Sequence, residues 1–219
     1  MTSEASSPTT PRGFYARRIF PRVVDIAMNT AENRRIRRAV CEPLHGEVLE
    51  IGFGSGHNLP FLPADVTRLL AVDPMQEGRA LARTRLAASN VEVDFVGLDG
   101  QRIELPDGSA DAALSTWTLC SIPDAVAAVR EIARVLRPGG VLHFAEHGLS
   151  PDAKVERWQH RLNPVQNRIG CGCNIQRDIP ALIEAGGMTV DQVETFYAKG
   201  DPKILGWTFQ GRASATGRS

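Results

Sequence analysis

The spacing of hydrophobic and polar residues changes near residue 46. Between residues 14 and 40, apolar positions recur every three or four residues, which predicts helices with a break near Pro21. After residue 46, short apolar runs typical of buried strands alternate with longer stretches of helical periodicity. Strands are expected at 48–51, 68–72, 91–96, 110–115 and 141–145. Helices are expected at 75–88, 124–137, 156–168 and 179–185.

Strands that alternate with helices predict an α/β fold in which a mostly parallel sheet is covered by helices on both faces. Two closing runs, 188–196 and 204–210, have no helical stretch between them, so these strands are expected to be antiparallel neighbours. Ligands of such sheets bind beyond the carboxyl ends of the strands. The residues that directly follow each strand are therefore the candidates for chemistry.

A glycine-rich turn follows the first expected strand. Gly52, Gly54 and Gly56 occupy every second position, and glycine permits a tight turn and close approach of a ligand to the backbone. A dinucleotide-binding loop has its third glycine one residue later. Glu50 would lie close to the phosphate anions of a dinucleotide, whereas S-adenosylmethionine presents a cationic ammonium and sulfonium. The charge therefore favours the cationic ligand.

Acidic residues end the next two expected strands. A carboxylate at Asp73 can accept hydrogen bonds from both hydroxyls of a ribose, or it can cap the following helix. Asp99 and Gly100 are placed to contact an adenine ring, or they form an ordinary turn. The residues expected to contact the cofactor are Glu50, Gly52, Gly54, Ser55, Gly56, Asn58, Asp73, Pro74, Met75, Asp99, Gly100 and Thr116.

In their order and spacing, the glycine loop and four later blocks resemble the class I S-adenosylmethionine-dependent methyltransferases. The resemblance covers about residues 46–146. It implies S-adenosylmethionine as cofactor and a Rossmann-like, seven-stranded, mostly parallel sheet with an antiparallel last strand. The blocks that carry it are 48–56, 72–75, 97–100, 105–111 and 136–140.

A narrower set of blocks is similar to the membrane-associated alkyl-thiol methyltransferases. The resemblance implies methyl transfer to a small, lipophilic acceptor and favours a thiol. Quinone and other small-molecule methyltransferases share the core blocks, so a carbon or oxygen acceptor stays open. Members of the alkyl-thiol family begin with a hydrophobic anchor, whereas this chain begins with a polar stretch. The similar blocks are 118–123, 144–147, 158–164 and 172–178.

His147 follows the fifth expected strand and is the candidate for the catalytic base or for an acceptor contact. The sulfonium leaves as a neutral thioether, so alignment and exclusion of water can supply most of the acceleration. A base is needed only where the acceptor must lose a proton, and histidine exchanges protons near neutral pH. The alternative is a structural histidine bonded to the backbone. Trp117 and Thr118 are expected to border the cofactor or acceptor pocket.

The chain has four cysteines, too few in this length for a disulfide framework. Cys171 and Cys173 would need two further ligands to close a zinc site, and no CxxC spacing supplies them. The pattern favours buried thiols in a turn of small residues, and the segment can also lie over the acceptor pocket. No metal is therefore expected, although Cys41 and Cys120 remain available as ligands.

Lysine plus arginine equals aspartate plus glutamate, 25 of each, which disfavours nucleic acid as a partner. The N-terminal helical segment alone is basic, and only Asp25 and Glu32 oppose its arginines. Such a segment contacts a membrane surface peripherally or presents a solvated helix face. Without a signal peptide or a long apolar run, a cytoplasmic location is expected. The arginines are Arg12, Arg17, Arg18, Arg22, Arg34, Arg35, Arg37 and Arg38.

These observations divide the chain into a disordered tail at 1–11, an N-terminal helical segment at 12–45, an S-adenosylmethionine-binding domain at 46–211 and a frayed end at 212–219. The leading hypothesis is methyl transfer from S-adenosylmethionine to a small acceptor by in-line displacement. One alternative is a nicotinamide-dependent oxidoreductase, which shares the sheet and the acid at Asp73. The other is a cofactor-binding interaction module without catalysis. The sequence does not define the oligomeric state.

Overall fold

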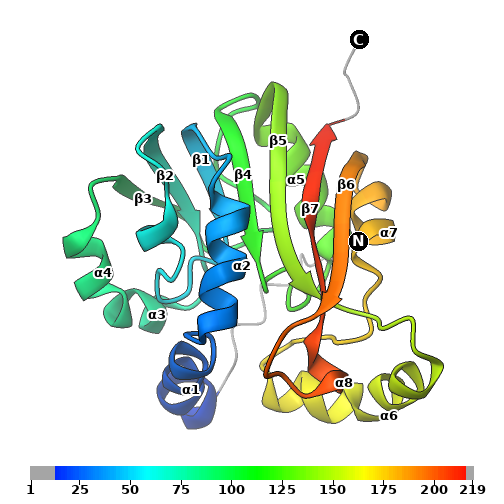
Figure 1. Cartoon of the computed structure of the whole chain (residues 1–219). Coiled ribbons are helices and arrows are strands. Elements are labelled where there is room, and N and C mark those ends of the chain that lie inside the picture. The colour runs from blue at the N-terminus through cyan, green and yellow to red at the C-terminus, as the bar shows by residue number, and fades with distance from the viewer. Residues whose placement is uncertain (1–12, 216–219) are drawn as a thin grey trace, which may run out of the picture.

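The computed structural model describes residues 13–215, in which seven strands form one sheet with the order β3-β2-β1-β4-β5-β7-β6 (Figure 1). Strands β1 to β5 are mutually parallel, and β7 is antiparallel to both β5 and β6. This arrangement confirms the predicted fold class. The strands are β1 Gly46–Ile51, β2 Val66–Val72, β3 Glu92–Gly97, β4 Ala110–Thr116, β5 Leu136–His147, β6 Met188–Tyr197 and β7 Trp207–Ala215.

Helices cover both faces of the sheet. Before β2 lie η1 Tyr15–Ile19, α1 Phe20–Ala27, α2 Ala31–Cys41 and η2 Leu59–Phe61. The later helices are α3 Gln76–Leu81, α4 Arg83–Ala88, α5 Ala125–Val135, α6 Ala153–Ile169, α7 Ile179–Ala185 and α8 Lys203–Gly206.

Two hydrophobic cores lie on opposite faces of the sheet, because successive side chains of a strand point to opposite faces. Ala113 of β4 packs in the core with Ile132 of α5 and Ile183 of α7. Leu114, the next residue, packs in the second core with Ile36 of α2. The central strands are buried on both faces, which explains their continuous apolar runs.

The N-terminal helices break later than the sequence predicted. Pro21 lies in the first turn of α1, where a helix needs no backbone N–H, so proline does not interrupt it. The chain breaks instead between α1 and α2. There the hydroxyl of Thr30 accepts a hydrogen bond of 3.0 Å from the backbone of Asn33 and caps α2.

Other boundaries also differ from the prediction. The helix expected at 75–88 is divided into α3 and α4, and the single turn of α8 separates β6 from β7. Strand β7 reaches Ala215, so residues 212–215 pair within the sheet. Residues 1–12 and 216–219 lie outside the described part of the chain, and with them the whole tail expected at 1–11 and part of the end expected to fray.

The carboxyl ends of the parallel strands meet at the lower edge of the sheet in Figure 1. Helix α1 lies below this edge on one side, and α6 and α8 lie below it on the other (Figure 1). The loops that follow β1, β2, β4 and β5 therefore lie at the same edge of the sheet as these helices. No helix within residues 13–215 is long and apolar enough to cross a membrane.

Candidate functional site

The glycine loop after β1 packs closely against its neighbours. Gly52 has φ of +81°, and a Cβ at that position would overlap the side chain of Thr118. A Cβ on Gly78 of α3 would lie 2.5 Å from the carbonyl oxygen of Gly54. By contrast, nothing lies within 4 Å of a Cβ built on Gly54, which has φ of +55°. The loop is thus held on two sides and open at Gly54, where a ligand can approach.

Asp73 joins this loop to the start of α3. One carboxylate oxygen accepts a hydrogen bond of 2.5 Å from the backbone of Gly54, and the other accepts one of 2.6 Å from the backbone of Met75. Burial raises the pKa of the Asp73 carboxyl. Each oxygen keeps acceptor capacity for a further donor. Pro74 is exposed beside it, and Met75 is half-buried.

The structure brings together three residues predicted from separate segments. The side-chain amide of Asn58 donates to Oε1 of Glu50 at 2.6 Å and to the hydroxyl of Thr116 at 3.0 Å. Glu50 is only 1% exposed, and burial raises its pKa to about 8, with a further contribution from the charge of Asp73. Oε2 of Glu50 and Oδ1 of Asn58 are buried without a hydrogen-bond partner among residues 13–215.

Two unpartnered acceptors in one buried cluster are costly unless a donor binds there. A cationic ammonium supplies several donors, and its charge would favour the ionised form of Glu50. The cluster therefore fits the ammonium group of S-adenosylmethionine. This fit rests on the orphaned oxygens of Glu50 and Asn58 and on the open space at Gly54.

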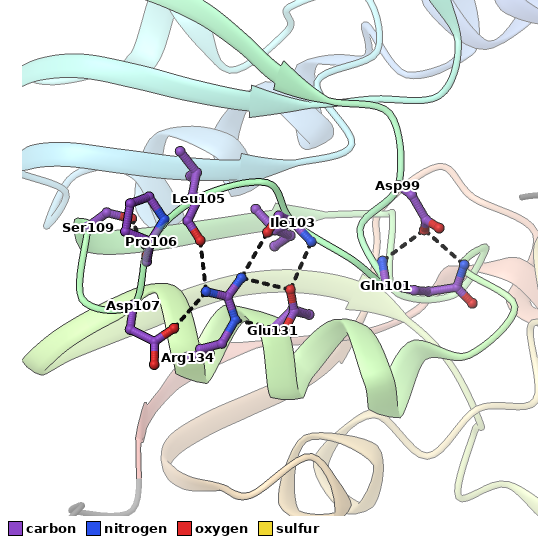
Figure 2. Close-up of polar contacts among 9 residues, drawn as sticks. All are labelled: Asp99, Gln101, Ile103, Leu105, Pro106, Asp107, Ser109, Glu131 and Arg134. Carbon is purple, nitrogen blue, oxygen red and sulfur yellow. Dashed lines mark hydrogen bonds and ion pairs between the residues drawn. The ribbon is translucent and has the colours of Figure 1, made fainter. Parts of the chain in front are cut away.

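The turn after β3 is stabilised by the side chain of Asp99. One Asp99 oxygen accepts hydrogen bonds of 2.9 Å from the backbone and from the side chain of Gln101 (Figure 2). A Cβ on Gly100 would lie 3.2 Å from Ile51, so this turn packs against the end of β1. Its place beside the glycine loop suits an adenine contact, and the side-chain hydrogen bonds of Asp99 itself are made within the turn.

The block at 105–111, which contributed to the family resemblance, has a structural role. Arg134 of α5 donates to the carbonyl oxygens of Ile103 and Leu105 and pairs with Asp107, each at 2.8 Å (Figure 2). Glu131 accepts from Arg134 and from the backbone of Ile103 (Figure 2). This network fastens the loop between β3 and β4 onto α5.

His147 lies at the end of β5 and is half-buried. Its Nδ1 is buried without a hydrogen-bond partner within the described residues, so the alternative of a histidine bonded to the backbone gains no support at that atom. The side chains of Cys120 and Cys173 lie beside it. A ring nitrogen of His147 and the two sulfur atoms all lie within 4.8 Å of one another. Cys171 is not in this group.

Glu146 was not predicted as a site residue. It is fully buried, and its Oε1 accepts hydrogen bonds from the hydroxyl of Ser115 at 2.7 Å and from the backbones of Thr118 at 2.9 Å and Leu119 at 3.1 Å. Burial raises its pKa. The carboxylate fixes the turn after β4, which carries Trp117 in a positive-φ conformation. The sequence signal that could have identified Glu146 is its position directly after an expected strand, at 141–145.

The N-terminal helix contributes a second missed residue. Asp25 of α1 accepts hydrogen bonds from the hydroxyl of Ser55 at 2.7 Å and from Arg85 at 2.9 Å, and it contacts His57 at 3.0 Å. The hydroxyl of Ser55, predicted to contact the cofactor, is thus engaged by Asp25. Burial lowers the pKa of His57 to about 4.

Arg37 of α2 is buried, so it does not belong to a solvated helix face. It donates to the carbonyl oxygen of Met28 at 2.8 Å and lies over the ring of Trp117, 4.6 Å from the centroid. Burial lowers its pKa to about 10. Both N-terminal helices therefore form part of the site wall. A hollow of about 520 Å³ at its rim is lined by Gly13, Phe14, Arg18 and Glu77.

Known methyltransferases resemble this chain in sequence. The model of the methyltransferase domain family matches residues 49–144. Thiol S-methyltransferase TMT1B of Rattus norvegicus is 32% identical, and that of Homo sapiens 35% identical, over 152 residues. These alignments cover 67% of this chain and 62% of each relative, so the chain spans about three fifths of the length of these relatives.

A 2-methyl-6-phytyl-1,4-hydroquinone methyltransferase of Synechocystis is 32% identical over 167 residues, which cover 74% of this chain and 49% of that protein. A solved chain from the complex between the Haloferax volcanii Trm112 methyltransferase activator and a methyltransferase superposes with a TM-score of 0.68. It is 18% identical, and the match covers 89% of this chain and 94% of that chain. The likeness to the solved chain concerns the fold alone.

The chain belongs to the class I S-adenosylmethionine-dependent methyltransferases. This confirms the predicted family, and S-adenosylmethionine is the methyl donor that the family implies. The membership favours the leading hypothesis over a nicotinamide-dependent oxidoreductase.

Proposed function

We propose that this protein transfers the methyl group of S-adenosylmethionine to a small, lipophilic thiol. The observation that carries the proposal is the alignment with thiol S-methyltransferases over two thirds of the chain. The similarity to a hydroquinone methyltransferase keeps a carbon or oxygen acceptor as the competing outcome.

The proposal assigns the site residues to separate parts of S-adenosylmethionine. The orphaned oxygens of Glu50 and Asn58 receive the ammonium group, and Asp73 receives the ribose hydroxyls. Asp99 and Gly100 border the adenine. Bound S-adenosylmethionine supplies an electrophilic methyl group, and the protein holds it in line with the acceptor while excluding water.

His147 contacts the acceptor from the end of β5. A thiol has a pKa near 8.5, so it needs little help to ionise, and an imidazole exchanges protons near neutral pH. The unpartnered Nδ1 of His147 is free to accept the thiol proton. The thiolate then displaces the neutral thioether.

Calorimetry with S-adenosylhomocysteine tests the cofactor half of the proposal. We expect binding by the wild type and a loss of at least tenfold in affinity for Asp73→Ala. NADH is the control ligand, and NADH binding without S-adenosylhomocysteine binding would restore the oxidoreductase hypothesis. Tight S-adenosylhomocysteine binding without methyl transfer to any acceptor would favour the interaction module instead.

Isotope-labelled S-adenosylmethionine tests the acceptor half. Alkyl thiols and alkyl hydroquinones of matched chain length are offered separately. We expect label in the thiol product only. Label in the hydroquinone product alone would show that the acceptor is a hydroquinone and not a thiol. The protein would still be a methyltransferase.

We also propose peripheral contact with an anionic membrane surface. Helix α6 exposes an apolar stripe at helical spacing that comprises Trp158, Leu162, Val165 and Ile169. The N-terminal helices expose a second stripe that comprises Phe14, Tyr15, Ile19, Val23 and Ile26. The Tyr15 hydroxyl donates to the carbonyl oxygen of Ile169 at 3.0 Å, which brings the two stripes together.

Charge complementarity selects the occupant of this surface. Exposed cations on these helices include Arg18, Arg22, Lys154, Arg157, Arg161 and Arg168. Apolar side chains flanked by cations favour the interface of an anionic bilayer. Both helices lie at the carboxyl edge of the sheet, so a lipophilic acceptor could enter from the bilayer (Figure 1).

Vesicle flotation tests this contact. We expect retention on phosphatidylcholine vesicles that contain phosphatidylglycerol, and loss of retention in Trp158→Glu. Val193→Glu is the matched control, because Val193 is an exposed apolar residue on β6. The proposal would be contradicted if the wild type and both variants were retained equally. It would also be contradicted if the vesicles retained none of the three.

A further inference from the structure

Three side chains with soft donor atoms converge from three segments of the chain. Cys120 follows β4, His147 ends β5, and Cys173 lies between α6 and α7. The two sulfur atoms are 3.7 Å apart, and a ring nitrogen of His147 lies within 4.8 Å of both. Both cysteines are buried and His147 is half-buried.

The backbone holds the two cysteines in register. The backbone N–H of Asn174 donates to the carbonyl oxygen of Cys120 at 2.8 Å. The side-chain amide of Asn167 donates to Gly172 at 2.9 Å, which orders the turn before Cys173. Next to Cys120, the backbone N–H of Leu119 donates a hydrogen bond to the carboxylate of Glu146. The sulfur atoms therefore face each other because of polar contacts outside the cluster.

The donor set and its spacing suit a tetrahedral metal ion. Thiolates and imidazole are preferred ligands of Zn²⁺, with Zn–S distances of about 2.3 Å. A tetrahedron of that size places two sulfur atoms about 3.8 Å apart, which agrees with the distance between Cys120 and Cys173. In such a site the imidazole nitrogen lies roughly 3.5 Å from each sulfur, so His147 would move by at most about 1 Å to reach a bonding position. Its Nδ1 has no other partner within the described residues.

We propose that Cys120, His147 and Cys173 bind Zn²⁺. Three protein ligands leave a fourth coordination position, the pattern of catalytic rather than structural zinc sites. In the part that rests on the proposed function, the acceptor thiol takes this position. It binds as the thiolate and releases its proton to solvent, and His147 then serves as a ligand instead of a base.

The methyl transfer balances without an oxidant. A lone pair of the acceptor sulfur forms a bond to the methyl carbon, and the bond from that carbon to the sulfonium breaks with its electron pair. The products are a thioether and S-adenosylhomocysteine. The thioether is a weaker ligand than the thiolate, because it is neutral, and it leaves the metal position.

Cobalt binding tests the metal site without any activity measurement. Chelator-treated, reduced protein is titrated with Co²⁺, whose visible absorption reports tetrahedral thiolate ligation, and Zn²⁺ then displaces it. We expect one Co²⁺ for each chain and a loss of at least tenfold in affinity for Cys120→Ser and Cys173→Ser. Cys171→Ser is the matched control, because Cys171 lies outside the cluster, and its affinity should equal that of the wild type.

Two results would overturn the metal site. One is the absence of tetrahedral cobalt absorption in wild type, which would leave the two cysteines as a packing contact without a metal. The other is an equal loss in Cys171→Ser. Binding of S-adenosylhomocysteine checks the fold of each variant, and His147→Asn is the substitute where a cysteine variant does not fold.

Addition of an alkyl thiol to the cobalt protein tests the open position. We expect the cobalt spectrum to shift, and an alcohol of equal length to leave it unchanged. An unchanged spectrum with the thiol would overturn the open position, even where labelled thiol product forms. A shifted spectrum without thiol methylation would instead count against the proposed function alone.

Discussion

Asp25 of α1 accepts a hydrogen bond of 2.7 Å from the hydroxyl of Ser55 in the glycine loop. The same carboxylate oxygen accepts from Arg85 and contacts His57. The N-terminal helix is thereby fastened across the glycine loop. A basic segment that the sequence suggested as a membrane foot or a solvated face is also a wall of the site.

We expect Asp25→Ala to weaken S-adenosylhomocysteine binding by roughly tenfold, because a hydrogen-bond network with a charged acceptor is worth about 1.5–3 kcal/mol. The loss should appear as faster dissociation, since α1 no longer covers the loop. Stopped-flow release of the ligand measures it. Glu32→Ala is the control, because Glu32 makes an exposed pair with Arg35 on α2. Equal dissociation rates for Asp25→Ala and the wild type would contradict this role.

Glu50→Gln should weaken cofactor binding and stabilise the ligand-free protein at pH 8. The folded pKa of Glu50, about 8, lies above its ordinary value of 4.5, so the folded state holds the proton more tightly than the unfolded state. Stability therefore falls as the pH rises from about 4.5 to 8. The glutamine avoids this loss, and we expect a gain of about 1–3 kcal/mol from urea unfolding at pH 8.

Cofactor binding at pH 7 should release a proton from Glu50, because the ammonium of the ligand favours the carboxylate. Calorimetry in buffers of different ionisation enthalpy measures this release. Glu47→Gln should behave as the wild type, because that carboxylate already pairs with Arg137. Undiminished proton release in Glu50→Gln would assign the proton to another group.

His143 of β5 should contribute to acid sensitivity. Burial lowers its pKa to about 4, below the ordinary value of 6.5, so the unfolded state binds the proton more readily. Stability then falls as the pH drops from 6.5 to 4. We expect His143→Gln to reduce this loss by about 1–3 kcal/mol, measured as urea midpoints across that range. His45→Gln removes a neighbouring charge that helps to lower the pKa of His143, so it should reduce the loss of stability by less than His143→Gln does.

The fold was predictable because its signals are local. Apolar runs located the strands, and the short connection between the last two runs, which holds only the single turn of α8, identified the antiparallel pairing of β6 and β7. The break after α1 was misplaced because Pro21 is compatible with a first helical turn. Pattern alone did not distinguish a proline that starts a helix from one that ends it.

Three predicted site residues, Glu50, Asn58 and Thr116, meet because they lie at or shortly after the carboxyl ends of neighbouring strands. Contacts between distant segments were not predictable from the pattern along the chain. Asp25 reaches Ser55 across 30 residues, and Cys173 reaches Cys120 across 53. The sequence paired Cys173 with its neighbour Cys171, whereas the fold pairs it with Cys120 and His147.

Gly78→Ala should lower cofactor affinity without unfolding the protein. Gly78 has an ordinary helical conformation, so alanine suits the backbone of α3 and would by itself favour the helix. Its Cβ, however, would lie 2.5 Å from the carbonyl oxygen of Gly54, a distance that forces α3 and the glycine loop apart. The hydrogen bonds that Asp73 makes to Gly54 and Met75 would lengthen together, because Asp73 spans the same two segments.

We expect Gly78→Ala to lose roughly tenfold in S-adenosylhomocysteine affinity by calorimetry, with a small change in the free energy of unfolding. Gly97→Ala is the matched control at the end of β3, because its Cβ meets only Val72 at 4.0 Å. Its cofactor affinity should equal that of the wild type. Unchanged affinity in Gly78→Ala would mean that the loop can move away from α3 without disturbing the ribose edge, and Asp73 would then lose its assigned role in holding the two together.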